Sequence, residues 1–280
     1  MNEIDISLFQ LSRKKGADFV VPYSSPQYHI ILFRGEAHFS LDFTEYVSTG
    51  DNTILFFTPY QTFLWLGNKD AEMRVLTFHG DFYCIEYHKK EVACNGLLFN
   101  NIYLYPHVSI SDDEYNEFLD VLGKMEKEIT NMNTVFSGSI LKAYLQLLLA
   151  LCSREKTKQL EQIETEITLN KEMTDMQYLL DAYFLTERSV SFYASQFALS
   201  PSAFTKKTRQ FFGKTPTQLI QDRVILEAKK MLHLTYKPVK EIASILNFDD
   251  EFYFSRYFKK NVGLSPLHYR EQVGISIVAK

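Results

Sequence analysis

The stretches VSFYASQFALSPSAFTKKTRQFFGKTP at 190–216 and VKEIASILNFDDEFYFSRYFKKNVGLSP at 239–266 share one pattern. In each, apolar residues recur at i, i+3, i+4 and i+7, which is the buried stripe of a short amphipathic helix. A tight turn, a second helical run and an exit of the form Gly-x-Thr/Ser-Pro follow each stripe. Helix, short turn and helix is the arrangement that places a second helix in a DNA major groove. Two copies in one chain predict a sequence-specific DNA-binding protein.

The stripe residues of the two copies lie 49 residues apart, and the second turn is one residue longer than the first. Phe204 and Thr208 are expected to face inward from one second helix, and Phe254 and Phe258 from the other. Two ordinary helical hairpins in a core would show the same periodicity. Basic residues on or beside the second helices favour the DNA-binding interpretation.

The second copy carries the specific likeness. Residues 248–260, FDDEFYFSRYFKK, followed by Gly263, Pro266, Tyr269 and Arg270, resemble the signature of the AraC/XylS family of bacterial transcription regulators. The likeness extends over roughly 176–272. Asn247 stands where the family usually has glycine, and Thr208 stands where a large apolar residue is common.

Charge is divided unevenly along the chain. Residues 171–280 hold 16 Lys and Arg against 11 Asp and Glu, a net charge of +5, whereas residues 1–170 carry −9. This split suggests that the carboxy-terminal part faces a polyanion and the rest faces something else.

Length and composition predict a two-domain protein. Cys84, Cys94 and Cys152 are scattered and indicate no disulfide framework and no metal site. The chain begins with no signal-peptide pattern and has no apolar run long enough to span a membrane. We therefore expect a cytoplasmic protein that makes no membrane contact.

The amino-terminal part has strand periodicity. Ala37, Phe39, Leu41 and Phe43 alternate with polar residues, and other strand-like runs are separated by turn residues. The pattern predicts a small barrel or jelly roll, and the family resemblance implies a cupin-like domain. The expected fold is α+β: a cupin-like β-barrel with flanking helices at 1–152 that senses and dimerises, a linker at 153–170 that is partly helical at most, and an all-α domain with two helix-turn-helix motifs at 171–280.

The segment Ile140–Leu151 is rich in leucine and has two interpretations. It can be a core helix on the barrel, or the seam of a homodimer, as the family resemblance implies. One face could serve both purposes. Its width favours an interface slightly.

Catalysis is not expected. The histidines are isolated, no H-x-H pair of a cupin metal triad occurs, and no catalytic motif is present. We expect no cofactor and no metal. A small-molecule effector pocket at the barrel mouth is a further hypothesis, with His29, Arg34, His38 and Trp65 as its candidate residues. For each residue taken singly, an ordinary core or surface role is the simpler interpretation.

The predicted DNA contacts follow from the helix faces. Ser200 is expected to cap the first recognition helix and Pro201 to open it. Aligned on the family's motifs, the base-facing candidates are Ser202, Thr205, Lys206, Glu251, Phe252, Ser255 and Arg256. The candidates for phosphate contacts are Lys207, Arg209, Lys259 and Lys260. The acidic run 249–251 is unfavourable beside phosphates, and its alternative role is to stabilise a helix N-terminus.

The sequence thus predicts a transcription regulator, with double-stranded DNA and RNA polymerase as partners and activation as the expected outcome. Two alternatives remain open. One is a regulator without a small effector, controlled by a protein partner or by its own level. The other is a cupin enzyme fused to a DNA-binding domain.

Overall fold

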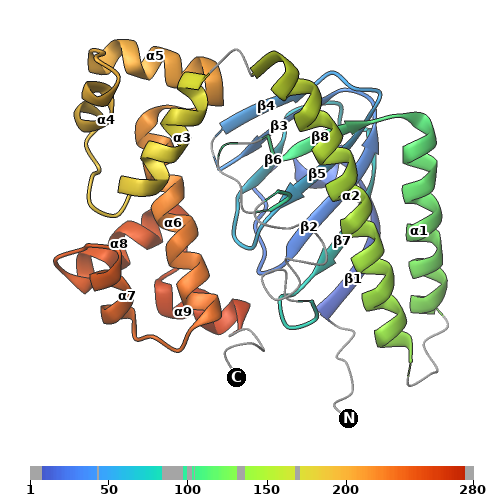
Figure 1. The fold of residues 1–280 in the computed structure, drawn as a ribbon. Helices are drawn as coiled ribbons and strands as arrows, with labels where there is room; N and C mark the ends of the chain where they lie inside the picture. Colours follow the sequence, from blue (N-terminus) through green and yellow to red (C-terminus); the bar gives the residue numbers. More distant parts are fainter. Residues whose placement is uncertain are drawn as a thin grey trace. The chain divides into compact units, whose positions relative to one another are not determined.

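The computed structural model describes residues 8–42, 44–83, 97–99, 103, 105–130, 136–167 and 171–274 (Figure 1). Contacts divide the chain into two compact units. The amino-terminal unit comprises Met1–Asn101 and Tyr105–Glu161, and the carboxy-terminal unit comprises Ile102–Leu104 and Gln162–Lys280. Phe43, Cys84, His88 and Cys94 lie outside the described residues.

The amino-terminal unit contains two antiparallel sheets. Five strands form one sheet in the order β1 (Phe9–Lys15), β7 (Glu72–Phe78), β2 (Tyr28–Arg34), β5 (Asn52–Phe57) and β8 (His107–Ile110). Three strands form the other in the order β4 (Thr44–Ser48), β3 (Ala37–Leu41) and β6 (Phe63–Trp65). A short 3-10 helix, η2 (Gly16–Phe19), follows β1.

The two sheets pack face to face around an aromatic core. Along β3, Ala37, Phe39 and Leu41 are buried and alternate with half-buried polar residues, as the sequence predicted. They meet side chains from the five-stranded sheet, such as Phe33 and Phe57. The expectation of a β-barrel is corrected here, because the described strands form two separate sheets rather than one closed cylinder.

The other face of the five-stranded sheet is covered by two helices, α1 (Asp112–Thr130) and α2 (Ser137–Ile167) (Figure 1). Strands β2 and β5 are buried on both faces, which explains their nearly continuous apolar sequences. On α2 the inward residues include Leu141, Leu145 and Leu148. The core-helix interpretation of Ile140–Leu151 is therefore confirmed for this inner face.

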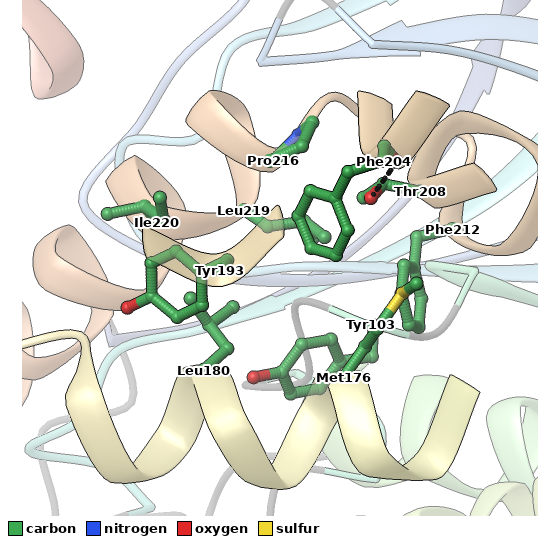
Figure 2. Close-up of a pocket in the computed structure, with 10 residues that line it drawn as sticks. All are labelled: Tyr103, Met176, Leu180, Tyr193, Phe204, Thr208, Phe212, Pro216, Leu219 and Ile220. Carbon is green, nitrogen blue, oxygen red and sulfur yellow. Dashed lines mark hydrogen bonds between the residues drawn. The ribbon is translucent and has the colours of Figure 1, made fainter. Parts of the chain in front are cut away.

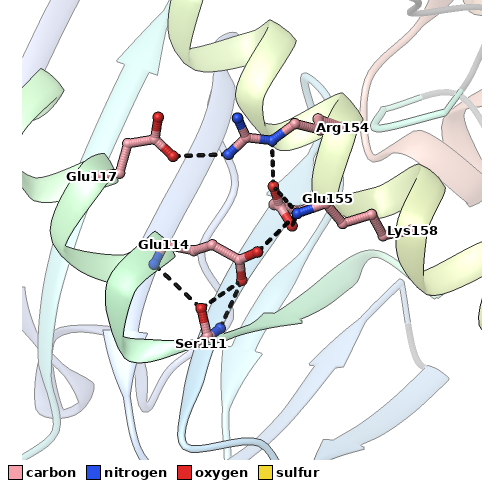
Figure 3. Close-up of polar contacts among 6 residues, drawn as sticks. All are labelled: Ser111, Glu114, Glu117, Arg154, Glu155 and Lys158. Carbon is pink, nitrogen blue, oxygen red and sulfur yellow. Dashed lines mark hydrogen bonds and ion pairs between the residues drawn. The ribbon is translucent and has the colours of Figure 1, made fainter.

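Ion pairs join α1 to α2 beyond their apolar contact (Figure 3). Arg154 binds Glu117 at 2.8 Å and Glu155 at 2.5 Å. Lys158 binds Glu155 at 2.8 Å and Glu114 at 3.0 Å. Glu155 is only 4% exposed, so its two cationic partners offset the cost of burying its charge.

Helix α2 continues well into the predicted linker. It stays helical to Ile167, whereas the sequence predicted a segment at 153–170 that is partly helical at most. The reason is tertiary: Lys156 is buried and donates hydrogen bonds to the carbonyl oxygens of Tyr105 at 2.7 Å and His107 at 2.6 Å. His107 is the first residue of the edge strand β8, so the ammonium supplies a hydrogen-bond partner at the edge of the sheet. Burial lowers the pKa of Lys156 to about 8.

The carboxy-terminal unit is helical. Its helices are α3 (Lys171–Tyr183), α4 (Val190–Gln196), α5 (Pro201–Phe212), α6 (Pro216–Leu234), α7 (Val239–Ile245), α8 (Glu251–Val262) and α9 (Pro266–Val273). In the part of the chain that the structure describes, no helix is long and apolar enough to cross a membrane.

Candidate nucleic-acid interface

Two helix-turn-helix motifs form the centre of the carboxy-terminal unit. We call α4 and α5 the first motif, α7 and α8 the second motif, and α5 and α8 the recognition helices. Both recognition helices have 12 residues, and each follows a first helix of 7 residues. Their inward residues match: Phe204, Thr208 and Phe212 in α5, and Phe254, Phe258 and Val262 in α8. The predicted duplication is confirmed.

The same capping chemistry bounds both recognition helices. The Ser200 hydroxyl accepts a hydrogen bond from the Ala203 backbone N–H at 3.2 Å, and the Asp250 carboxylate accepts one from the Tyr253 N–H at 2.8 Å. Gly213 and Gly263 end the helices with left-handed φ angles of 67° and 87°. Ser200 is the predicted cap, and Asp250 is the one residue of the acidic run that caps α8.

A left-handed residue also shapes each turn inside the motifs. Ala198 has φ 51° and Asn247 has φ 56°. Asparagine tolerates this conformation better than alanine does, which explains how Asn247 stands where the family usually has glycine. The small residues Ala194 and Ala243 are buried where the paired helices pack closely.

On α5, the predicted base-facing residues lie on the side away from the core. Ser202 and Lys206 are exposed and Thr205 is half-buried. Two hydroxyls already make local bonds: Thr205 donates to the Pro201 carbonyl at 2.8 Å, and Ser202 lies 3.0 Å from the Ser200 hydroxyl. Lys206 is therefore the long side chain on this face that can donate hydrogen bonds.

On α8, Arg256 is exposed, and Glu251 and Ser255 are half-buried beside it. Phe252 is 67% exposed, so its ring lies on the outer face rather than in the core. The predicted phosphate-contact residues Arg209, Lys259 and Lys260 are exposed and Lys207 is half-buried, all in the later turns of their helices. Each recognition helix thus presents polar and charged side chains along one outer face.

Comparison with known proteins agrees with this geometry. Residues 193–272 match a family described as a helix-turn-helix domain. Over 94 residues the chain is 34% identical to the arabinose operon regulatory protein of Salmonella typhimurium, covering 34% of each chain. The carboxy-terminal domain belongs to the AraC/XylS family. The chain matches only about one third of the length of that relative.

A longer match reaches beyond this AraC/XylS domain. The chain is 25% identical over 205 residues to the HTH-type transcriptional activator RhaR of an Enterobacter species, covering 72% of this chain and 71% of that one. Among solved structures, ToxT from Vibrio cholerae aligns with 94% of this chain and 98% of that chain, at 14% identity and a TM-score of 0.40.

An apolar hollow borders the first motif of the AraC/XylS domain (Figure 2). Side chains of α3 to α6, including Leu180, Phe204 and Leu219, line it together with Tyr103. Thr208 lies at its wall, 1% exposed, and donates its hydroxyl to the Phe204 carbonyl at 2.8 Å. Tyr103 donates to Asp181 at 3.1 Å, and burial raises the pKa of this tyrosine. No local pattern pointed to Tyr103, because this residue lies far along the chain from its partner Asp181.

The four candidates for an effector pocket lie in different surroundings. His29 is buried, stacks on Phe57 with ring centroids 4.2 Å apart and donates to the Gln27 carbonyl at 3.0 Å. Burial lowers its pKa to about 3. Trp65 is buried and donates to the Asn68 carbonyl at 2.9 Å.

The other two candidates face solvent. Arg34 lies over the Tyr115 ring, and His38 lies 3.1 Å from Glu45. Among the described residues, the hydrogen bonds, ring contacts and ion pair of these four side chains go to different partners, so the effector pocket stays a prediction.

Proposed function

We propose that this protein is a sequence-specific DNA-binding transcription regulator, an activator, that reads two successive major-groove segments with α5 and α8. The observation that carries the proposal is the pair of matched recognition helices, each with a capped N-terminus and a polar outer face. Double-stranded DNA is the primary partner, and RNA polymerase is the partner that activation requires.

Individual residues on the outer faces of α5 and α8 can be matched to particular groups of the DNA. Lys206 and Arg256 can donate to O6 and N7 of guanine, and Glu251 can accept from N4 of cytosine. The exposed Phe252 ring suits contact with a thymine methyl group. The hydroxyls of Ser202, Thr205 and Ser255 can hydrogen-bond to more than one kind of base. The phosphate contacts fall to Lys207, Arg209, Lys259 and Lys260.

We further propose that the protein forms a homodimer through α2. Exposed apolar residues separated by four and three positions in turn are Phe136, just before the helix, and Ile140, Ala143, Leu147 and Ala150 on its outer face. This spacing is the seam of a coiled coil. Phe136 is 68% exposed and Leu147 is 46% exposed, while the opposite face packs on the sheet. The core and the dimer seam would then use two faces of one helix.

Sedimentation of the full chain tests the dimer. A double substitution, Ile140→Glu and Leu147→Glu, should convert dimers to monomers. Ser139→Glu, which adds a charge at an exposed position beside the seam, is the matched control and should leave the dimer intact. A double variant that stays dimeric would contradict an α2 seam.

Packing between the sheets favours a regulator without a small effector at the predicted pocket. Phe33, Phe39, Phe57 and Phe63 fill that interior, and His29 and Trp65 use polar atoms in internal hydrogen bonds. Control would then come from a protein partner or from the protein's own level. Full DNA affinity of the purified protein without added ligand would support this second candidate, and affinity that depends on an added small molecule would contradict it.

Selection of genomic fragments with the full-length protein, at stated salt concentration, tests the main proposal. The expected result is a site with two short half-sites about one helical turn apart, roughly 34 Å. A control variant with both Lys206→Ala and Arg256→Ala should lose that enrichment. Recovery of DNA without any shared sequence would overturn the proposal.

A further inference from the structure

Arg188 links the two motifs directly. It lies in the segment between α3 and α4, immediately before the cap of the first motif, yet its guanidinium reaches the turn of the second motif. There it donates to the Leu246 carbonyl, and its Cζ lies 4.0 Å from the centre of the Phe248 ring. The two bonded residues are 58 positions apart in the sequence.

The backbone that carries Arg188 is fixed to the first motif. The Tyr193 hydroxyl on α4 donates to the Glu187 carbonyl at 2.7 Å, and the Glu187 N–H donates to the Tyr183 carbonyl at 2.7 Å. On the other side, the Ser189 hydroxyl accepts from the Phe192 N–H at 3.3 Å. Hydrogen bonds therefore hold the residues on both sides of Arg188.

The same segment is also fixed to the connecting helix α6. Arg223 on α6 donates to Asp181 at 2.8 Å, and its Cζ lies 4.0 Å from the centre of the Phe184 ring. Movement of Arg188 relative to α6 would have to break these contacts.

The far end of the link is equally well defined. Leu246 is the C-cap of α7, so its carbonyl is one of the terminal acceptors that an isolated helix leaves unsatisfied and that a cation stabilises. Phe248 is 6% exposed, and its ring lies 5.1 Å from that of Phe254 and 5.2 Å from that of Tyr257. Both of those rings belong to α8. A guanidinium stacked on Phe248 therefore contacts the part of the core that orients the second recognition helix.

Two connections restrain orientation more than one does. Helix α6 joins the motifs through the chain and packs against helices of both, α5 of the first motif and α7 and α8 of the second. Arg188 adds a side-chain connection away from the α6 termini. Asp249, Tyr253 and Tyr257 are the titratable groups that face it, and Asp249 offsets its positive charge.

We propose that Arg188 is a positioning residue that fixes the orientation of the second motif relative to the first and thereby sets the half-site spacing that the protein accepts. The inference rests on the proposed reading of two DNA segments. It gives Arg188 no contact with bases, because its guanidinium is directed to Leu246 and Phe248.

The test uses the full-length protein and a DNA library in which the two selected half-sites are separated by variable spacers. Wild type should enrich one spacing. In Arg188→Ala, enrichment of that spacing over its one-base-pair neighbours should fall about tenfold, which corresponds to ~1.4 kcal/mol. The half-site sequences and the dependence of affinity on salt should not change. Arg188→Lys should lie between the two, because an ammonium can reach the carbonyl but lacks the planar stack.

Arg270→Ala is the matched control. Arg270 also donates to backbone carbonyls, those of Leu232 at 3.1 Å and Lys237 at 2.6 Å, and both of these residues lie outside the first motif. It should keep the wild-type spacing preference. Phe248→Leu, which keeps an apolar core and removes the stacked ring, should relax the spacing in the same direction as Arg188→Ala, without adding to it in the double variant.

Each possible result of this experiment leads to a different conclusion. If Arg188→Ala lowers affinity equally at all spacings, Arg188 supports folding only and the inference fails. If it lowers the salt slope by about 0.9, Arg188 contacts a phosphate and the inference also fails. If wild type shows no preference for paired half-sites, the proposed function itself fails.

Discussion

In the first motif the recognition helix turns Thr208 inward, whereas in the second motif the matching position is Phe258. The surrounding frames are nevertheless alike in helix length, caps and terminal glycine. The frame is therefore set by turns and caps, and it tolerates very different interior residues. What changes is how each motif is held together.

The second motif has an aromatic interior of its own. Phe254 and Phe258 have ring centroids 6.0 Å apart, and Phe258 and Tyr269 have centroids 5.5 Å apart. The first motif instead borders the hollow in Figure 2, where Tyr103 and residues of α3 supply part of the wall. We infer that the first motif depends more on its neighbours for stability.

The two recognition helices also differ in charge. Helix α5 carries Lys206, Lys207 and Arg209 without an acidic residue, whereas the turn before α8 and its first residue carry the acidic run 249–251. Only Asp250 of this run is used as a cap. The first motif should therefore contribute more electrostatic affinity to DNA than the second.

The largest expected difference between the motifs concerns packing. Phe258→Ala removes a fully buried ring and should lower the free energy of unfolding by about 3–5 kcal/mol. Thr208→Ala removes a hydroxyl bonded within its own helix and should cost about 1 kcal/mol. Urea unfolding followed by circular dichroism at helix wavelengths measures both. Trp65 fluorescence serves as the control, because the single tryptophan lies in the amino-terminal unit. Equal losses would mean that the interiors do not differ in the way described.

The next prediction separates the motifs by what they read. Arg256→Ala should cost ~1–3 kcal/mol of binding and relax specificity at one base pair of one half-site, and Lys206→Ala should do the same in the other half-site. Sequencing of DNA selected by each variant shows where specificity is lost. A uniform loss with a shallower salt slope would instead make the residue a phosphate contact.

A smaller effect is expected from matched pairs of phosphate-contact residues. Substituting Lys207 and Arg209 by glutamine should reduce the slope of log affinity against log salt by about 1.8, the value for two phosphates. The same change at Lys259 and Lys260 should reduce it by less, because the acidic run lowers the local positive potential. Titrations at several salt concentrations give both slopes. A larger reduction for the second pair would reverse the proposed order of the two motifs.

Local features were predictable from the sequence, and features that depend on distant contacts were not. The duplicated motifs, the cap at Ser200 and the inward phenylalanines follow from spacing and residue type within a few turns of helix. Closure of the barrel and the end of α2 depend on how sheets and helices meet, and both expectations needed correction. Arg188 gave no periodic signal, because its partner lies 58 residues away. The base-facing residues remain predictions, although their exposure agrees with the assignment.

The smallest predicted effect tests the turns. Ala198 and Asn247 are both exposed and left-handed, so glycine can replace either without loss of packing. A left-handed backbone costs a non-glycine residue roughly 1–2 kcal/mol, and substitution by glycine removes this cost. Part of the resulting gain in stability is offset by the greater freedom of glycine in the unfolded chain. Ala198→Gly should therefore raise the stability of the carboxy-terminal unit by about 0.5–1 kcal/mol. Asn247→Gly should change it by less, because asparagine already tolerates this conformation. Thermal unfolding of the two variants ranks them, and a larger gain from Asn247→Gly would show that strain is not what distinguishes the two turns.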